Sequence, residues 1–197
     1  FFFFAQTVNR NDGGATLLKY PARLEGIVAA VRAEVTRVSG IHVPVSVKLR
    51  LGWDDPSSIL ENVRRAEDGG ARWITIHART KLNGYQPPAY WEWIARARKL
   101  VQVPIIANGD IWTIEDFRKC REITGCEHFM IGRGALADPW LSKRIAAELD
   151  PNKNLIQTLP DRTDLSAWLP LLQKFAVHSA QYGHRNIGHT QEQGRYC

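Results

Sequence analysis

The sequence is poor in cysteine, with three cysteines among its 197 residues. Cys120, Cys126 and Cys197 form neither a CxxC pair nor a Cys/His spacing of the kind that holds zinc. This scarcity excludes a small scaffold framed by disulfides, and it predicts no metal site. Reduced thiols are typical of cytosolic proteins, so we expect a cytoplasmic location.

Long apolar runs are also missing. No uninterrupted stretch approaches the roughly 20 apolar residues that a membrane-spanning helix needs, so we expect no membrane span. The chain does not begin with methionine, and the phenylalanines at its start lack the basic region and the cleavage pattern of a signal peptide. We interpret this start as a cut end.

The sequence does contain enough apolar material for a packed core, with 44% hydrophobic residues that include seven tryptophans. A composition of this kind is typical of a folded protein, and the length predicts one domain with a short appendage. The formal net charge of +6 and the isoelectric point near 9.4 favour a polyanionic partner. Many basic proteins nevertheless bind no nucleic acid.

Short apolar runs alternate with helical patterns along most of the chain. Val45–Leu51, Trp73–His77 and the runs that open Val103–Ile111 and Phe129–Leu136 predict strands, and Thr113–Thr124 predicts a helix between the last two. Unbroken apolar strands separated by helices are typical of a parallel sheet. The sequence therefore predicts an α/β fold that corresponds to the C-terminal half of a (β/α)8 barrel.

Two helix starts can be predicted from capping residues. Ser58 and Glu61 have the spacing of a capping box, and Asp138-Pro139 has the pattern of an N-cap followed by a first helical residue. Beyond the repeat, leucines and aromatic residues from Leu165 onward predict an amphipathic helix. We expect a partial barrel over residues 1–150, a linker over 151–163 and the start of a helical domain over 164–197.

Glycine loops follow the last two predicted strands. Asn108-Gly109 and Gly132-Arg133-Gly134 lie where the carboxyl ends of parallel strands would place them together. Glycine lets backbone N–H groups approach a phosphate, and arginine offers a fork of donors to phosphate oxygens. In (β/α)8 barrels the loops after the last two strands often bind phosphate. The alternative is that these glycines only turn the chain.

Two further candidates lie on the preceding strands. The strand Val45–Leu51 alternates strictly, so Lys48 and Arg50 share its polar face. A polar inner face in a barrel suggests a ligand or a buried polar layer. His77 ends the next strand, where barrel enzymes carry their functional groups. The alternatives are an ordinary exposed strand lysine and a structural histidine.

Several motifs together resemble a known family. They are Asp12-Gly13-Gly14-Ala15-Thr16-Leu17-Leu18, Val47-Lys48-Leu49-Arg50-Leu51-Gly52-Trp53, His77-Ala78-Arg79-Thr80, Gly84-Tyr85, Ile106-Ala107-Asn108-Gly109-Asp110-Ile111 and Met130-Ile131-Gly132-Arg133-Gly134-Ala135. In this order they resemble the tRNA-dihydrouridine synthases, FMN-dependent (β/α)8 enzymes with a C-terminal helical domain. The details are most similar to the bacterial C-type branch, which acts on uridine 16 of the D loop.

The resemblance implies a reaction in which NADPH reduces FMN and the reduced flavin reduces a uridine of tRNA. It implies that Lys48 stabilises the anionic reduced flavin and that His77 contacts the flavin. Asn108, Gly109, Gly132 and Arg133 match the phosphate site of the family. Asp110 either lies near the ribityl chain or caps the following helix.

The same resemblance suggests contacts with tRNA at Arg50, Arg79, Lys81, Tyr85 and Arg185. Cations neutralise phosphates, and a tyrosine can stack on a base. The alternative is that the loop carrying Arg79, Lys81 and Tyr85 is merely solvated.

The sequence departs from the family pattern near its start. Phe3 stands where the family has the cysteine that donates a proton to the substrate. We therefore expect the intact protein to be monomeric and active, and this chain to be an inactive fragment that self-associates. The alternatives are a non-catalytic remnant that binds flavin or RNA, and another FMN-dependent barrel oxidoreductase.

Overall fold

The computed structural model describes residues 13–150 and 159–183. By its internal contacts the chain divides into two compact units, Phe1–Ala146 and Ala147–Cys197. The first contains the sheet, and the described part of the second includes a long helix over Leu165–Gly183. Each is described by itself.

The centre of the first unit is a parallel sheet of four strands in the order β1-β2-β3-β4. The strands are β1 (Ser46–Arg50), β2 (Trp73–His77), β3 (Ile105–Asn108) and β4 (His128–Met130). Each neighbouring pair is parallel, so a helical crossover joins every strand to the next. This confirms the predicted α/β fold with a barrel-like strand–helix repeat.

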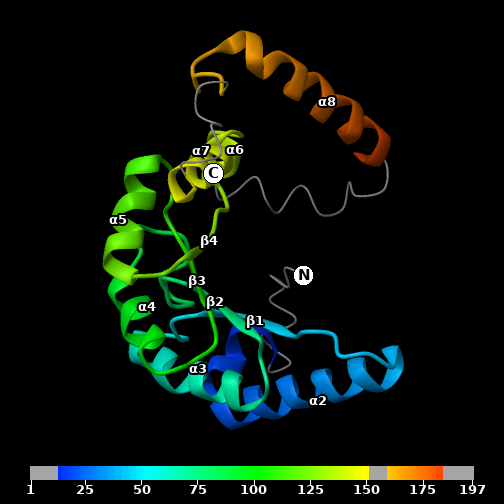
Figure 1. Cartoon of the computed structure of the whole chain (residues 1–197), viewed down its shortest axis with the longest axis vertical. Coiled ribbons are helices and arrows are strands. Elements are labelled where there is room, and N and C mark those ends of the chain that lie inside the picture. The colour runs from blue at the N-terminus through cyan, green and yellow to red at the C-terminus, as the bar shows by residue number, and fades with distance from the viewer. Residues whose placement is uncertain (1–12, 151–158, 184–197) are drawn as a thin grey trace. The chain divides into compact units, whose positions relative to one another are not determined.

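Helices cover one face of this sheet. The elements around the strands are the short 3-10 helices η1 (Gly14–Lys19) and η2 (Pro56–Ser58), with α2 (Pro21–Ser39), α3 (Ile59–Asp68), α4 (Trp91–Arg98), α5 (Ile114–Thr124), α6 (Gly134–Ala137) and α7 (Leu141–Leu149). Figure 1 shows α3, α4 and α5 side by side along the same face, and each contacts its neighbour. The opposite face remains available for a site.

The core lies between the sheet and these helices. Ile74 and Ile76 of β2 are fully buried, and so are Phe117 and Cys120 of α5. Phe117 meets Phe129 in a T-shaped contact with ring centroids 4.8 Å apart. Because alternate residues of a strand share a face, Ile74 and Ile76 point to the same side of β2 and into this core.

One predicted helix start is right but lacks its predicted capping bond, and another start is shifted: α3 begins at Ile59, directly after Ser58. The Ser58 side chain makes no capping bond. Instead, the Asp55 carboxylate accepts from the Ser57 amide at 2.9 Å and begins a 3-10 turn before α3. Asp138 follows α6 and accepts from the Trp140 amide at 2.9 Å, so it caps a turn and α7 begins only at Leu141. In both places a short polar turn precedes the helix, because an Asx side chain satisfies the backbone two residues on.

The second unit contains α8 (Leu165–Gly183), which includes Pro170. Its apolar side chains are largely exposed, with Leu165 81%, Leu169 58% and Phe175 71% accessible. The predicted linker over 151–163 lies mostly outside the described residues, as does the end of the chain after Gly183.

Candidate functional site

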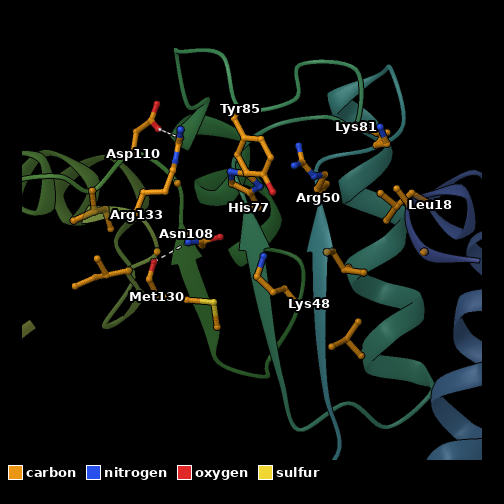
Figure 2. Close-up of a pocket in the computed structure, with 18 of the residues that line it drawn as sticks. Leu18, Lys48, Arg50, His77, Lys81, Tyr85, Asn108, Asp110, Met130 and Arg133 are labelled. Atoms are coloured by element: carbon orange, nitrogen blue, oxygen red, sulfur yellow. Dashed lines mark hydrogen bonds and ion pairs between the residues drawn. The ribbon is translucent and has the colours of Figure 1, made fainter. Parts of the chain in front are cut away.

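The carboxyl ends of the four strands place polar side chains in one row. The strand register pairs Arg50 with His77, His77 with Asn108, and Asn108 with Met130. These residues line a cavity of about 660 Å³ on the sheet face opposite the helices. Figure 2 shows Lys48, Arg50, His77 and Asn108 around this cavity. Lys48 and Arg50 come from β1, His77 from β2 and Asn108 from β3. Lys48, two residues before Arg50, extends the row inward.

The cavity is strongly electropositive. Burial, followed by the charges of Arg50, Lys48, Arg79 and Arg133 in that order, lowers the pKa of His77 from 6.5 to about 3. His77 is therefore a neutral imidazole at physiological pH. Burial and then the Arg50 charge also lower the pKa of Lys48. Several cations around one cavity favour an anionic ligand.

Arg50 is 9% exposed, and its guanidinium supports the loop that follows β2. It donates to the carbonyl oxygens of Thr80 and Gly84 at 2.8 Å each. Its guanidinium also lies 5.2 Å from the centroid of the Tyr85 ring. Burial is the main cause that lowers the Arg50 pKa. Arg50 could therefore contact tRNA only through a nucleotide that enters the cavity.

Tyr85 lies at the mouth of the cavity, between two arginines. The guanidinium of Arg133 lies 5.2 Å from its ring centroid, the same distance as that of Arg50. The imidazole of His77 is 6.0 Å away and tilted by 37°. Tyr85 remains 46% exposed, so one ring face can meet a ligand.

Gly109 and Asp110 follow β3 directly, and both have positive φ. Gly109 has φ +125°, and a Cβ on it would lie 3.2 Å from Cδ2 of His77. Only glycine therefore allows this close approach of the loop to the imidazole. Asp110 has φ +51°, and its side chain points towards Arg133, as Figure 2 shows.

The loop after β4 carries Gly132 and Arg133. A Cβ on Gly132 would meet no atom within 4 Å, so the backbone there faces open space. Arg133 lies over the Trp112 ring at 4.9 Å and is 3.5 Å from the Asp110 carboxylate. Asn108 donates from its side-chain amide to the Met130 carbonyl at 2.8 Å, which ties this loop to β3. The structure thus brings together all seven residues predicted for the cofactor.

Arg79 does not occupy the place that the sequence predicted. Its side chain is fully buried, and it pairs with the Asp110 carboxylate. Its Nε donates to the Gln86 carbonyl at 2.5 Å, and its NH1 is 3.5 Å from Nε2 of His77. A buried guanidinium with these partners cannot reach a tRNA phosphate. Arg79 instead belongs to the wall behind the cavity.

The rim contains residues that sequence reasoning missed. Trp53 lies between two lysines, with the Nζ of Lys19 4.2 Å and that of Lys81 5.9 Å from its ring centroid. Lys81 was predicted, whereas Lys19 and Trp53 were not assigned to the site. The lysines are 62 positions apart in sequence, so no local pattern could have shown that they meet.

Other candidates are absent from the cavity or lie outside the description. Cys120 and Cys126 are buried in the core, and burial raises the pKa of both thiols, that of Cys120 to about 12. Neither lines the cavity. Phe3 and Arg185 lie outside the described residues. Within residues 13–150 and 159–183, no cluster of three metal-binding side chains occurs. No helix in those ranges is long and apolar enough to cross a membrane.

An FMN-sized ligand is compatible with this arrangement. The cavity volume lies within the roughly 300–1,000 Å³ of small-molecule sites. Arg133 and the open backbone at Gly132 suit a phosphate. Lys48 and neutral His77 also line the cavity, where a charged or hydrogen-bonding ring edge could meet them.

Comparison with known proteins identifies one family. The model of the family described as dihydrouridine synthase (Dus) matches residues 5–185. This range includes every described element.

Individual relatives have the same kind of name. The tRNA-dihydrouridine(16) synthase of Pseudomonas syringae pv. tomato is 52% identical over 143 residues, which cover 73% of this chain and 44% of the relative. The protein of that name in Pseudomonas putida is 44% identical over 171 residues, covering 87% of this chain and 50% of the relative. The protein of that name in Cupriavidus necator is 48% identical over 146 residues, which cover 74% of this chain and 44% of the relative. The chain therefore spans about half the length of the curated relatives it matches.

Proposed function

Because this chain belongs to the dihydrouridine synthase family, we propose that its cavity binds FMN and forms part of a tRNA-dihydrouridine(16) synthase. The observation that supports this most is a cavity at the carboxyl ends of four parallel strands, lined by Lys48 and Arg50 of β1 and by Arg133 of the loop after β4. Ligands of parallel α/β sheets bind at this edge. The relatives named above supply the substrate class, a uridine in tRNA.

We assign a separate part of the flavin to each group of cavity residues. Arg133 and the Gly132 backbone hold the phosphate. Lys48 would stabilise negative charge on the isoalloxazine ring, and neutral His77 would donate or accept one hydrogen bond with it. Bound FMN supplies hydride transfer to the substrate base, and NADPH is the proposed reductant. Tyr85 offers a ring face to that base at the cavity mouth.

The rim supplies the contacts to RNA. Trp53 with Lys19 and Lys81 combines an aromatic face with two cations beside the cavity. Such a combination suits a nucleic-acid backbone with an unstacked base. This replaces Arg79, which is buried, as the proposed phosphate contact.

Flavin titration tests the cofactor. We expect the apoprotein to bind FMN more tightly than riboflavin, and Arg133→Ala to weaken FMN binding about tenfold, because a charge-assisted contact is lost. Arg65→Ala is the matched control. Arg65 pairs with Glu25 at 2.9 Å on the helix layer and does not line the cavity. Equal affinities for the two flavins in the unmodified protein would contradict the proposed phosphate site.

Salt-dependent binding tests the RNA contact. We expect tRNA affinity to fall with salt, and Lys19→Gln with Lys81→Gln to flatten the logarithmic slope by about two units, because two phosphate contacts are lost. Lys99→Gln with Lys143→Gln is a control of equal charge, since neither residue lines the cavity. A slope that changes equally in both double variants would mean that the rim makes no specific contact.

A further inference from the structure

We propose that buried Arg79 sets the preference of this cavity for phosphorylated over unphosphorylated flavin. It does so by engaging the Asp110 carboxylate, which would otherwise compete with the flavin phosphate for Arg133. The inference rests on the proposed function, because it requires a phosphate to bind at Arg133.

The first argument is the unequal sharing of one carboxylate. The Arg79 side chain is fully buried, whereas the Arg133 side chain is 48% exposed. One Asp110 oxygen pairs closely with Arg79, and the other lies 3.5 Å from Arg133. A buried guanidinium needs a carboxylate partner, because an uncompensated buried charge is costly. Asp110 is therefore held mainly by Arg79, and its contact with Arg133 is the looser one.

The second argument is the rigidity of the group that holds Asp110. Arg79 is also fixed by the Gln86 carbonyl at 2.5 Å, in the loop that follows β2. Among the described residues, Asp110 is the one non-glycine with positive φ. Left-handed backbone is unfavourable for residues other than glycine, and Asp tolerates it when its side chain is bound. The pair thus places the carboxylate at a defined distance from Arg133.

The third argument is the balance of charge. Arg133 has ring contacts with Tyr85 and Trp112 besides its contact with Asp110. Without Arg79, the Asp110 carboxylate would keep Arg133 as its cationic partner. An incoming phosphate would then have to displace a stronger ion pair. Removing the carboxylate as well should relieve that competition.

The test compares FMN with riboflavin, which lacks the phosphate. The proteins are the unmodified chain, Arg79→Gln, Arg79→Gln/Asp110→Asn and the control Arg65→Gln. We expect the ratio of FMN to riboflavin affinity to fall about fivefold in Arg79→Gln, because a competing ion pair strengthens. We expect the double variant to recover most of that ratio. The riboflavin affinity of Arg79→Gln should change less than about twofold, because riboflavin makes no phosphate contact. The ratio of FMN to riboflavin affinity in Arg65→Gln should also change less than about twofold, because Arg65 lies away from that contact.

The outcomes separate this inference from the proposed function. No preference for FMN in the unmodified chain would contradict the proposed phosphate site itself. A normal preference that survives in Arg79→Gln, or a double variant no better than the single one, would overturn the inference. Equal loss of both flavins in Arg79→Gln would also overturn it, since that pattern belongs to a merely structural residue. If Arg79→Gln does not fold, the single variant Asp110→Asn decides the question. We expect its ratio of FMN to riboflavin affinity to equal or exceed that of the unmodified chain. A lower ratio would contradict the proposal.

Discussion

At the scale of the residue, His77 combines burial with an unusual concentration of positive charge. It is 8% exposed, and its pKa falls from 6.5 to about 3, chiefly through desolvation. Between these two values the unfolded chain binds a proton that the folded chain does not. The free energy of unfolding should therefore decrease as the pH falls from 6.5 towards 3, by up to roughly 5 kcal/mol from this group. Above pH 6.5 the contribution is complete and constant.

Urea denaturation at a series of pH values measures this effect. We expect His77→Gln to lose that part of the pH dependence. His128→Gln is the control, because His128 is an exposed histidine on β4. A His77→Gln profile parallel to that of the unmodified protein would show that the imidazole titrates normally.

Lys48 offers a second test at this scale. Desolvation and Arg50 lower its pKa, yet the residue remains open to solvent through the cavity. A lower pKa gives a larger fraction of neutral, reactive amine. We expect limited acetylation at pH 8 to label Lys48 faster than exposed Lys99, and FMN to slow the labelling of Lys48 alone. Peptide mass spectrometry resolves the two sites, and identical rates with no protection would place Lys48 outside the flavin site.

Gly109 allows a comparison of two glycines. Alanine at Gly109 would be strained at φ +125° and would press on His77, so we expect a loss of about 1–3 kcal/mol in unfolding free energy. Gly26 lies inside α2 with open space around it. There, alanine should stabilise the protein by up to about 1 kcal/mol because of its helix propensity. Opposite signs in thermal or urea unfolding are the expected result, and equal signs would contradict it.

At the scale of the element, α5 begins with a reciprocal capping box. The Thr113 hydroxyl accepts from the Asp116 amide at 3.1 Å, and the Asp116 carboxylate accepts from the Thr113 amide at 3.0 Å. Thr113→Ala should therefore lower the free energy of unfolding by about 1 kcal/mol. Thr36→Ala is the control, since that hydroxyl is exposed and bonds the Arg32 carbonyl within a helix. If both variants lose the same stability in urea, the cap contributes nothing of its own.

Elements were predictable where the signal is local. The helix Thr113–Thr124 was predicted from its apolar spacing within one residue of α5, and the Thr113 cap and Gly125 mark the same ends in the structure. The predicted strands contain the observed ones except in the last run, where β4 (His128–Met130) begins one residue before Phe129. The helix start at Ser58 was predicted correctly, but the capping bond expected there is absent, and Asp55 caps the 3-10 turn that precedes α3 instead. A capping spacing alone does not show which polar residue the backbone will use.

The role of Arg79 could not be predicted in the same way. Its partner Asp110 is 31 residues away and comes close only because β2 and β3 are adjacent and parallel. The row of Lys48, His77 and Asn108 was predictable, because strand ends in a parallel sheet must meet at one edge. Which cation faces the cavity and which stands behind it depends on loop packing, for which the sequence carries no periodic signal.

At the scale of the whole molecule, the described surface contains features that favour association. Within residues 13–150, β1 and β4 each have one side without a paired strand. Apolar side chains are exposed on α2, where Val31 is 43% accessible, and on α8, where Phe175 is 71% accessible. Unpaired strand edges and exposed apolar patches both promote self-association. The predicted self-association of this chain therefore remains our expectation.

Light scattering after size-exclusion chromatography measures the mass of the species that this chain forms in solution. We expect a mass above the 22.3 kDa of one chain, increasing with concentration. Val31→Glu and Phe175→Glu, tested separately, should each reduce the mass if its own helix takes part, and Lys99→Glu serves as a control for added negative charge. A single species of one chain mass at all concentrations would contradict the expectation.

The stacking of Arg133 on Trp112 has an optical consequence. Indole emission overlaps flavin absorption, so a flavin bound in this cavity should quench the fluorescence of Trp112 by energy transfer. Trp91, whose indole donates to the Gly109 carbonyl at 2.9 Å, reports on the same loop. The chain thus carries its own spectroscopic probe at the proposed phosphate site, and ligand occupancy can be followed there without any added label.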